Sequence, residues 1–290
     1  MKYFVHSPFN ISYVSGPHFG DIDATGRICI WHLSFHSQVR QTEEGNAAPN
    51  KIYIPFAGAI RTPNTSTAFY IRLHHLQLLP EFHKQQHWNI PLRVHRQFSY
   101  LGNTSFCRDL TFRNALTNQL LATGITSNVC VDLTTGRSTK LPTEYLEEIS
   151  KEKLTRTKQP QGFVQPDQPK DCFVHTITVT SSCIDTNDHQ NMALYIRDCW
   201  NAGSLAACSK SLPHFDKELL YFKVKTVTFL YQGQALIGDE LNIACWEHQH
   251  DPNTLCFTVT KGSKVTGQCQ MEFYYEHDIR LESGDIQSKL

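Results

Sequence analysis

The chain has 290 residues, of which 40% are hydrophobic and 19% are charged, and this composition excludes an intrinsically disordered protein. Its 27 Lys and Arg balance its 27 Asp and Glu, which argues against a nucleic-acid-binding protein that depends on excess positive charge. No stretch approaches about 20 uncharged apolar residues, so no membrane span is expected. Residues 1–20 lack the continuous apolar run of a secretory signal.

The first half of the chain is predicted to contain a strand, a helix and then further strands. Apolar residues at helical spacing after Gly26 predict the helix, and these are Ile28, Trp31, Phe35 and Val39. Runs rich in aromatic and β-branched residues predict strands over residues 3–14, 67–76, 90–101, 107–114 and 120–132. A short helix over residues 142–153 is expected to close this half.

The second half repeats the same order of elements. A strand over residues 172–182 precedes a helix that begins near His189. The helix is predicted by a buried stripe of Met192, Tyr195, Ile196, Cys199 and Trp200. Four strands follow, over residues 219–231, 240–247, 255–260 and 266–276, with a hairpin turn at residues 261–264.

This order predicts an α+β protein made of two similar units, each a long helix laid on a curved antiparallel sheet. The expected units are residues 1–155 and 172–290. The segment 156–171 between them contains prolines and glutamines and is expected to be a crossing linker. The length of the chain accommodates two units of about 140 residues each.

A short polar segment precedes each predicted helix. In the first half Asp21 and Asp23 are followed by Thr25, and in the second half Asp185 is followed four residues later by His189. If Asp21 matches Asp185, Thr25 stands where the second half has its histidine. The first half is therefore expected to lack a complete site.

The ten cysteines are scattered along the chain and form no CxxC pair. Because no secretory signal is expected, they are interpreted as reduced, mostly buried, small hydrophobic residues. The fifteen histidines raise the question of a metal site. The pairs His32/His36 and His248/His250 have no nearby third ligand of suitable type and spacing, so no metal is expected.

The segment before the second helix carries the residues best suited to chemistry. Asp185, Asn187 and His189 alternate, and in an extended segment all three side chains would point to one side. The helix that follows adds unpaired N–H groups and the positive end of its dipole. A carboxylate can activate water, N–H groups can hold an oxyanion, and an imidazole can move a proton, which together permit acyl transfer to water. A simple N-cap is the alternative interpretation.

This segment resembles the D-x-N-x-H-x-N-x-x-x-Y motif of plant and bacterial acyl-ACP thioesterases, which are double hotdog proteins. The motif runs from Asp185 to Tyr195 in this chain. The first half is similar to the same family at residues 108–114, 121–124 and 135–144. The resemblance implies two tandem hotdog units and thioester hydrolase activity.

The resemblance implies catalytic roles for Asp185, Asn187 and His189. The family has a further Glu or Cys on a later strand, and here Gln232 stands at the Glu position and Gly233 at the Cys position. A glutamine can orient a water but cannot act as a base or a nucleophile. This departure shifts the role of base or nucleophile to Asp185.

Three further residues are expected to contact the substrate. Asn191 belongs to the motif, and Trp31 and Phe35 lie on the first helix, which the resemblance implies shapes the acyl pocket. No cofactor is expected. Hotdog proteins often pair, so a homodimer is an open expectation, although two units in one chain can form such a pair internally.

The last three residues, Ser288-Lys289-Leu290, match the peroxisomal address that an import receptor reads at a free C-terminus. A peroxisomal location is therefore expected, with a chance polar tail as the alternative. Peroxisomal fatty-acid chemistry uses CoA esters, so the expected reaction is hydrolysis of a fatty acyl-CoA to the free acid and CoA. Acyl-ACP is the alternative substrate.

Two other functions stay open at this point. A hotdog enoyl-CoA hydratase carries a D-x-N-P-x-H pattern whose His lies five residues after the Asp, whereas His189 lies four residues after Asp185. A non-catalytic acyl-CoA-binding protein is the third interpretation, and Gln232 is the residue that motivates it.

Overall fold

The computed structural model describes residues 2–7, 10–15, 22–24, 26–35, 66–84, 90–185 and 188–275. In the first half, the described elements are β1 (Lys2–Ser7), β2 (Asn10–Ser15), α1 (Ile30–Phe35), β3 (Thr67–Leu78), α2 (Pro80–His83), β4 (Leu92–Leu101), β5 (Ser105–Asn114), β6 (Leu120–Asp132) and α3 (Thr143–Ile149). In the second half they are β7 (Phe173–Thr178), α4 (Met192–Cys208), β8 (Val224–Tyr231), β9 (Glu240–His248), β10 (Asp251–Lys261) and β11 (Lys264–Phe273).

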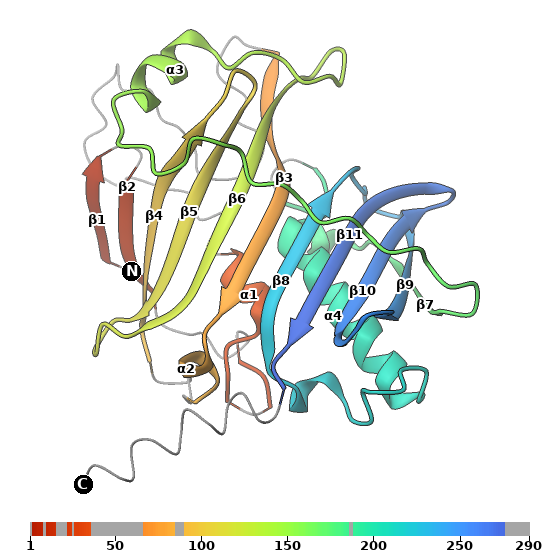
Figure 1. Cartoon of the computed structure of the whole chain (residues 1–290). Coiled ribbons are helices and arrows are strands. Elements are labelled where there is room, and N and C mark those ends of the chain that lie inside the picture. The colour runs from red at the N-terminus through yellow and green to blue at the C-terminus, as the bar shows by residue number, and fades with distance from the viewer. Residues whose placement is uncertain are drawn as a thin grey trace, which may run out of the picture.

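All these strands belong to one antiparallel sheet with the order β1-β2-β4-β5-β6-β3-β8-β11-β10-β9-β7. The strands of each half occupy one side of the sheet, and β3 and β8 join the two sides (Figure 1). The second half has the predicted order of a strand, a helix and four strands. Its hairpin is also confirmed, because Lys261 pairs with Lys264 and Gly262 takes the positive φ of 57° that a tight turn needs.

The prediction of a single strand over residues 3–14 is wrong. β1 and β2 pair with each other as a hairpin that reverses between Ser7 and Asn10. Pro8 has no N–H to donate to a continuous ladder, which favours a reversal at this place. The first helix is described only as Ile30–Phe35, so the expected contribution of Val39 lies outside the described residues.

The register across the sheet defines which side chains share a face. His74 of β3 lies opposite Thr126 of β6 on one side and Phe229 of β8 on the other. Residues directly opposite each other point to the same face. The side chain of His74 approaches Ser34 of α1, so this face is the one that α1 and α4 cover, and we call it the inner face.

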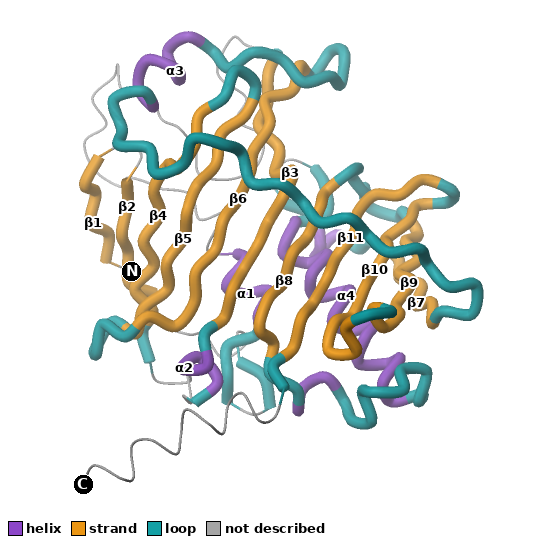
Figure 2. The backbone as a smooth tube through the Cα atoms, viewed as in Figure 1, coloured by secondary structure: helices purple, strands orange, loops and turns teal. Residues whose placement is uncertain are grey.

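The segment between the two halves crosses the opposite, outer face. Residues 153–170 contain neither helix nor strand, and Figure 2 shows them running across the sheet from the first half to the second. The backbone N–H of Arg156 donates to Ser99 O at 2.8 Å, and Gln159 Nε2 donates to Ser127 Oγ at 2.6 Å. Further along, Gln165 Nε2 donates to Phe257 O at 3.0 Å. The segment is thus attached to strands of both halves.

The largest cluster of buried hydrophobic residues lies between the inner face and the helices. It includes Leu33 of α1, Phe112 and Leu121 of the first half, and Ile196 and Phe257 of the second. Both halves therefore share one core. The expectation for the cysteines is confirmed, since all ten are free thiols and eight of them are buried.

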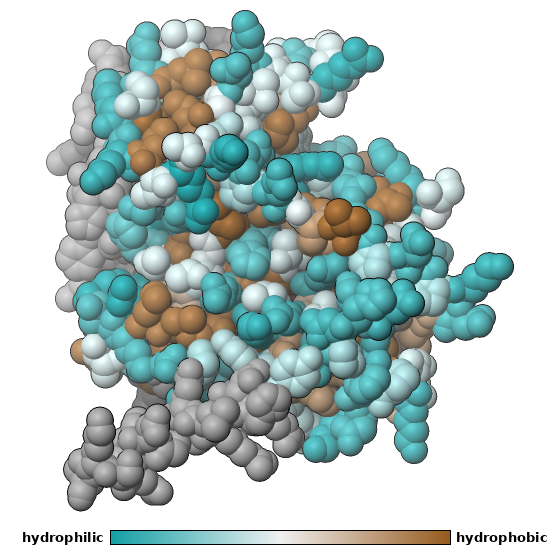
Figure 3. Space-filling view, in the orientation of Figure 1, coloured by the Kyte–Doolittle hydropathy of each residue, from teal (hydrophilic) through white to brown (hydrophobic). Residues whose placement is uncertain are grey.

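Figure 3 shows the face that the connecting segment crosses, where hydrophobic patches alternate with hydrophilic side chains. Val164, in that segment, is 91% exposed. Among the described helices, none combines the length and the hydropathy needed to cross a membrane.

Candidate active site

The loop before α4 is closed rather than extended. Ile184 and Gln190 form an antiparallel bridge, and the N–H of Asp185 donates to His189 O at 2.9 Å. The N–H of Asp188 donates to Asp185 O at 3.1 Å, and Asp188 has a φ of +62°. The expectation that an extended segment points the polar side chains to one side is therefore wrong. Asp188 takes a positive φ that Asp tolerates, and the chain bends so that Asp185 and His189 meet across a loop.

Asn187, the third expected catalytic residue, lies outside the described residues together with Thr186. Asp185 and His189 are both described, and the carboxylate of Asp185 interacts electrostatically with the imidazole of His189. The loop thus brings together the two side chains that the motif separates by four positions.

The first half contains a loop of the same geometry. Ile22 and Ile28 form the bridge, the N–H of Asp23 donates to Arg27 O at 2.8 Å, and Gly26 has a φ of +79°. The helix begins seven residues after the aspartate in both halves, at Ile30 and at Met192.

This geometry corrects the expected alignment of the two halves. Asp23, rather than Asp21, matches Asp185, and Arg27, rather than Thr25, stands where the second half has His189. The guanidinium of Arg27 donates a hydrogen bond to Leu220 O at 2.9 Å, which fixes the side chain. Asp23 Oδ1 accepts the N–H of Arg27 at 3.1 Å and so stabilises its own loop. The first loop has no imidazole at the matched position.

His189 is half-buried and lies next to a residue of the other half. Its ring centroid is 6.1 Å from that of Tyr70 on β3. Burial lowers the pKa of His189, while the negative charges of Asp185 and Asp188 oppose the change without cancelling it. The imidazole is therefore neutral near pH 7 and can accept a proton.

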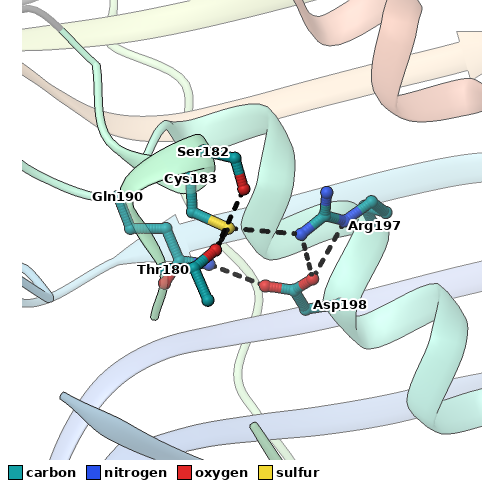
Figure 4. Close-up of polar contacts among 6 residues, drawn as sticks. All are labelled: Thr180, Ser182, Cys183, Gln190, Arg197 and Asp198. Carbon is teal, nitrogen blue, oxygen red and sulfur yellow. Dashed lines mark hydrogen bonds and ion pairs between the residues drawn. The ribbon is translucent and has the colours of Figure 1, made fainter. Parts of the chain in front are cut away.

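Behind the loop, Gln190 connects it to a buried carboxylate on α4 (Figure 4). Gln190 Nε2 donates to Asp198 Oδ2 at 2.7 Å, and its backbone N–H donates to Ala235 O at 2.8 Å. Arg197 Nη2 donates to Asp198 Oδ1 at 2.9 Å. Burial raises the pKa of Asp198, and the charge of Arg197 works in the opposite direction. The residue next to His189 is thus fixed to the helix and to the segment after β8.

Cys183 completes this network on the other side of the loop (Figure 4). Its Sγ lies 3.5 Å from Thr180 Oγ1 and accepts a hydrogen bond of 3.6 Å from Arg197 Nη2. Burial alone would raise the pKa of the thiol, but these hydrogen bonds outweigh it and the pKa is lowered. Cys183 O also accepts the N–H of Asn191 at 2.8 Å, which closes the base of the loop.

Asn191, expected to contact substrate, is the N-cap of α4. Its Oδ1 accepts the N–H of Ala193 at 2.9 Å. An Asn at this position satisfies one of the N–H groups that a helix start leaves without a partner. The N-cap interpretation therefore holds for Asn191, while the closed loop that carries Asp185 and His189 precedes the cap.

The other expected residues lie further from the loop. Gln232 follows β8, is exposed and donates through Nε2 to Gln268 Oε1 at 2.7 Å, so the described contacts do not join it to Asp185 or His189. Trp31 and Phe35 pack against the shared core, and the ring of Trp31 lies 6.4 Å from that of Trp200 on α4. Trp31 thus lies at the contact between the two helices.

Three residues around the site were not expected from the sequence. Tyr70 comes from a strand more than a hundred positions away from His189, which no local pattern reveals. Asp198 could have been noticed from the sequence, because it is a charged residue beside the apolar stripe of the second helix, whereas its partner Gln190 lies before that helix begins.

Comparison with solved structures identifies the fold. The chain is similar to the 12:0-ACP thioesterase of Umbellularia californica, with a TM-score of 0.70 and 13% identity over 93% of this chain and 99% of the other. It is also similar to an acyl-ACP thioesterase of Bacteroides thetaiotaomicron, with a TM-score of 0.65 and 16% identity over 91% and 98% of the two chains. No protein-family profile and no curated protein sequence matches the chain. The predicted fold, two tandem hotdog units of the α+β class, is confirmed.

Proposed function

We propose that the protein hydrolyses fatty acyl thioesters, with Asp185 and His189 as the reacting pair. The observation that carries this proposal is the closed loop, which places a carboxylate next to a neutral imidazole at the start of the 17-residue helix α4. The fold, shared with two acyl-ACP thioesterases, supports the same reaction class.

The proposed chemistry uses both side chains and the helix. With Asp185 as the base, a water loses its proton to the carboxylate and its oxygen attacks the thioester carbonyl carbon. The negative charge that develops on the carbonyl oxygen is stabilised by the positive end of the α4 dipole. The neutral His189 takes this proton from the Asp185 carboxyl and passes it to the departing sulfur, which leaves as a free thiol. In the alternative route Asp185 attacks the carbonyl itself, and water then hydrolyses the anhydride.

For the carrier we propose CoA. Ser288-Lys289-Leu290 is a peroxisomal address when it forms a free C-terminus, and CoA esters are the acyl thioesters of that compartment. The tripeptide lies outside the described residues, so its support comes from the sequence. An N-terminally tagged fluorescent fusion should accumulate in peroxisomes, and deletion of Leu290 should return it to the cytosol.

One assay with three substrates tests the function. Purified protein is given dodecanoyl-CoA, dodecanoyl-ACP and trans-2-dodecenoyl-CoA, while free thiol and enoyl absorbance are followed together. Release of thiol from dodecanoyl-CoA, faster than from dodecanoyl-ACP and lost in Asp185→Asn, is the expected result. Faster release of thiol from dodecanoyl-ACP would show that ACP rather than CoA is the preferred carrier, and would leave the proposed hydrolysis unchanged.

Two outcomes would contradict the proposed reaction. Loss of enoyl absorbance without thiol release would make the protein a hydratase. Binding of dodecanoyl-CoA without any turnover, measured by calorimetry, would make it an acyl-CoA-binding protein. Retention of full activity in Asp185→Asn would remove the assigned pair from the mechanism.

A further inference from the structure

The inner face of the first half carries polar side chains where a hydrophobic core is expected. His74, Arg96, Arg108, Thr126 and Asn128 lie on four neighbouring strands, and we call them the polar cluster. Arg108 is opposite Thr126, and Thr126 is opposite His74, so three members form one row across the sheet. The exposed fractions of His74, Arg96 and Arg108 are 0%, 2% and 4%, and those of Thr126 and Asn128 are 2% and 5%.

The second half has apolar residues at the matched positions. Gly124 of β6 and Gly267 of β11 end the matching triplets Ala122-Thr123-Gly124 and Val265-Thr266-Gly267, and β6 and β11 occupy matching places beside β3 and β8. We count along the ladders from these two glycines to find equivalent positions in the two halves. His74 is equivalent to Phe229, Thr126 to Cys269, and Arg108 to Phe257. Asn128 likewise matches Met271, and Arg96 matches Ile243. The same backbone thus holds a polar cluster in one half and a dry core in the other.

The side chains of His74 and Asn128 each leave one polar atom without a hydrogen-bond partner among the described residues. These atoms are His74 Nδ1 and Asn128 Nδ2, and both are buried. The other ring nitrogen of His74 is within hydrogen-bond distance of Ser34 Oγ, at 3.0 Å. Burial, and secondarily the charge of His75, lowers the pKa of His74 to about 3, so the ring is neutral and offers a hydrogen bond rather than a charge. Buried polar atoms left unpaired destabilise a fold and call for a partner.

The polar cluster begins close to the candidate active site. Tyr70, whose ring lies next to His189, is followed on β3 by Ile71, and Ile71 is opposite Asn128. His74 is four residues beyond Tyr70, roughly 13 Å along the strand. Along β3 the polar cluster thus begins one residue beyond Tyr70, which itself is opposite Val129 and faces the other side of the sheet.

The inner face of the second half is closely packed against α4. Within α4, an added Cβ on Gly203 would lie 2.7 Å from Leu219 and 3.2 Å from Phe257, so this helix is in close contact with its sheet. Phe229, Phe257 and Met271 are fully buried there. Because the second half is closely packed here, we place the acyl chain on the side of the first half.

From these observations we infer that the polar cluster recognises an oxygen atom on the acyl chain, so that the preferred substrates are oxygen-bearing acyl thioesters rather than plain saturated ones. Asn128 Nδ2 donates to that oxygen, and His74 Nδ1 supplies a second hydrogen bond. Arg96 and Arg108 place positive charge beside it and favour a carboxylate over a hydroxyl. The inference rests on the proposed function, because it names the substrate class of that site.

The test compares three CoA esters that differ only at the far end of the chain. They are dodecanoyl-CoA, 12-hydroxydodecanoyl-CoA and dodecanedioyl-CoA, and kcat/KM is measured for each. At least one oxygen-bearing ester should exceed dodecanoyl-CoA by about tenfold or more, because a plain chain leaves the cluster unpaired. A preference for dodecanedioyl-CoA identifies a carboxylate as the recognised group, and a preference for the hydroxy ester identifies a hydroxyl.

Variants that copy the second half show whether the cluster causes the preference. His74→Phe and Asn128→Met should each reduce about tenfold the ratio of kcat/KM for the favoured oxygen-bearing ester to kcat/KM for dodecanoyl-CoA. His75→Phe is the matched control, because His75 is on the same strand but faces the outer side, where its Nδ1 is 2.7 Å from Thr228 Oγ1. The control should keep the preference of the unmodified protein.

The inference and the proposed function can fail separately. If no ester is hydrolysed, the function fails, and calorimetric affinities of the same three esters still decide whether oxygen is preferred. Equal kcat/KM and equal affinity for all three esters, or a preference that persists in both His74→Phe and Asn128→Met, would overturn the inference and leave the cluster as a site for ordered water.

Discussion

The loop before α1 and the loop before α4 turn the chain in the same way but present different side chains. Both have the bridge, the aspartate N–H bond and the positive φ, yet Arg27 occupies the place of His189. The strands beneath the two loops also differ. The first half, whose loop has no imidazole, carries the polar cluster, and the second half has apolar residues at the matched positions. The comparison indicates that the repeat preserves backbone geometry while the side chains at matched positions differ between the two halves.

The strongest test of this difference changes the two matched aspartates. Asp185→Asn should lower kcat for thioester hydrolysis by about 10²–10⁴-fold, since it removes the proposed base. Asp23→Asn should leave kcat within about twofold, because the amide Oδ1 can still accept the N–H of Arg27. Thiol release from dodecanoyl-CoA measures both. Similar losses in the two variants would mean that both loops take part in the reaction.

A second test asks whether the two halves unfold together. Phe112→Ala in the first half and Phe257→Ala in the second each remove a fully buried ring from the shared core, and each should cost about 3–5 kcal/mol of unfolding free energy. Because the core spans both halves, each variant should show a single cooperative transition in thermal or urea denaturation. Two separate transitions would show that the halves are independent folding units.

A smaller effect is expected at the N-cap of α4. Asn191→Ala removes the acceptor for the N–H of Ala193 and should cost about 1 kcal/mol, measured by urea denaturation. Asn191→Asp keeps an oxygen at the same place and is the matched control. If Asn191→Ala left stability unchanged but raised KM, the expected role of Asn191 in substrate binding would be favoured over the cap.

The smallest expected effect concerns the pH dependence of activity. His189 acts in its neutral form, so activity should fall in acid as the ring is protonated, at a pH below its ordinary pKa of 6.5. Asp188 stabilises the protonated ring, so Asp188→Asn should lower the pKa of His189 further and move the acid limb of kcat/KM to lower pH. Asn tolerates the positive φ at this position. A shift to higher pH would contradict the assigned interaction.

The sequence predicts most regular elements because their patterns are local. The strand over residues 120–132 coincides with β6, and the apolar stripe that includes Met192 and Cys199 coincides with α4. The hairpin at residues 261–264 follows from a Gly that can take a positive φ.

The geometry of the loop and of the polar cluster could not be predicted in the same way. Alternating polar residues suit an extended segment, and only the positive φ of Asp188 with the Ile184–Gln190 bridge reveals the closed turn. His74 and Asn128 appear as ordinary members of two strands far apart in the chain. Their proximity depends on the register of β3 against β6, which single-strand patterns do not specify.

The pairing of His74 with Phe229 at the centre of the sheet has a consequence for how such a protein can evolve. In a symmetric dimer of identical subunits, the two residues that meet at the twofold axis must be the same, so a change in one is a change in both. Joining the two units in one chain removes this constraint. A single substitution can then give one half a polar surface while its neighbour across the axis remains an aromatic ring.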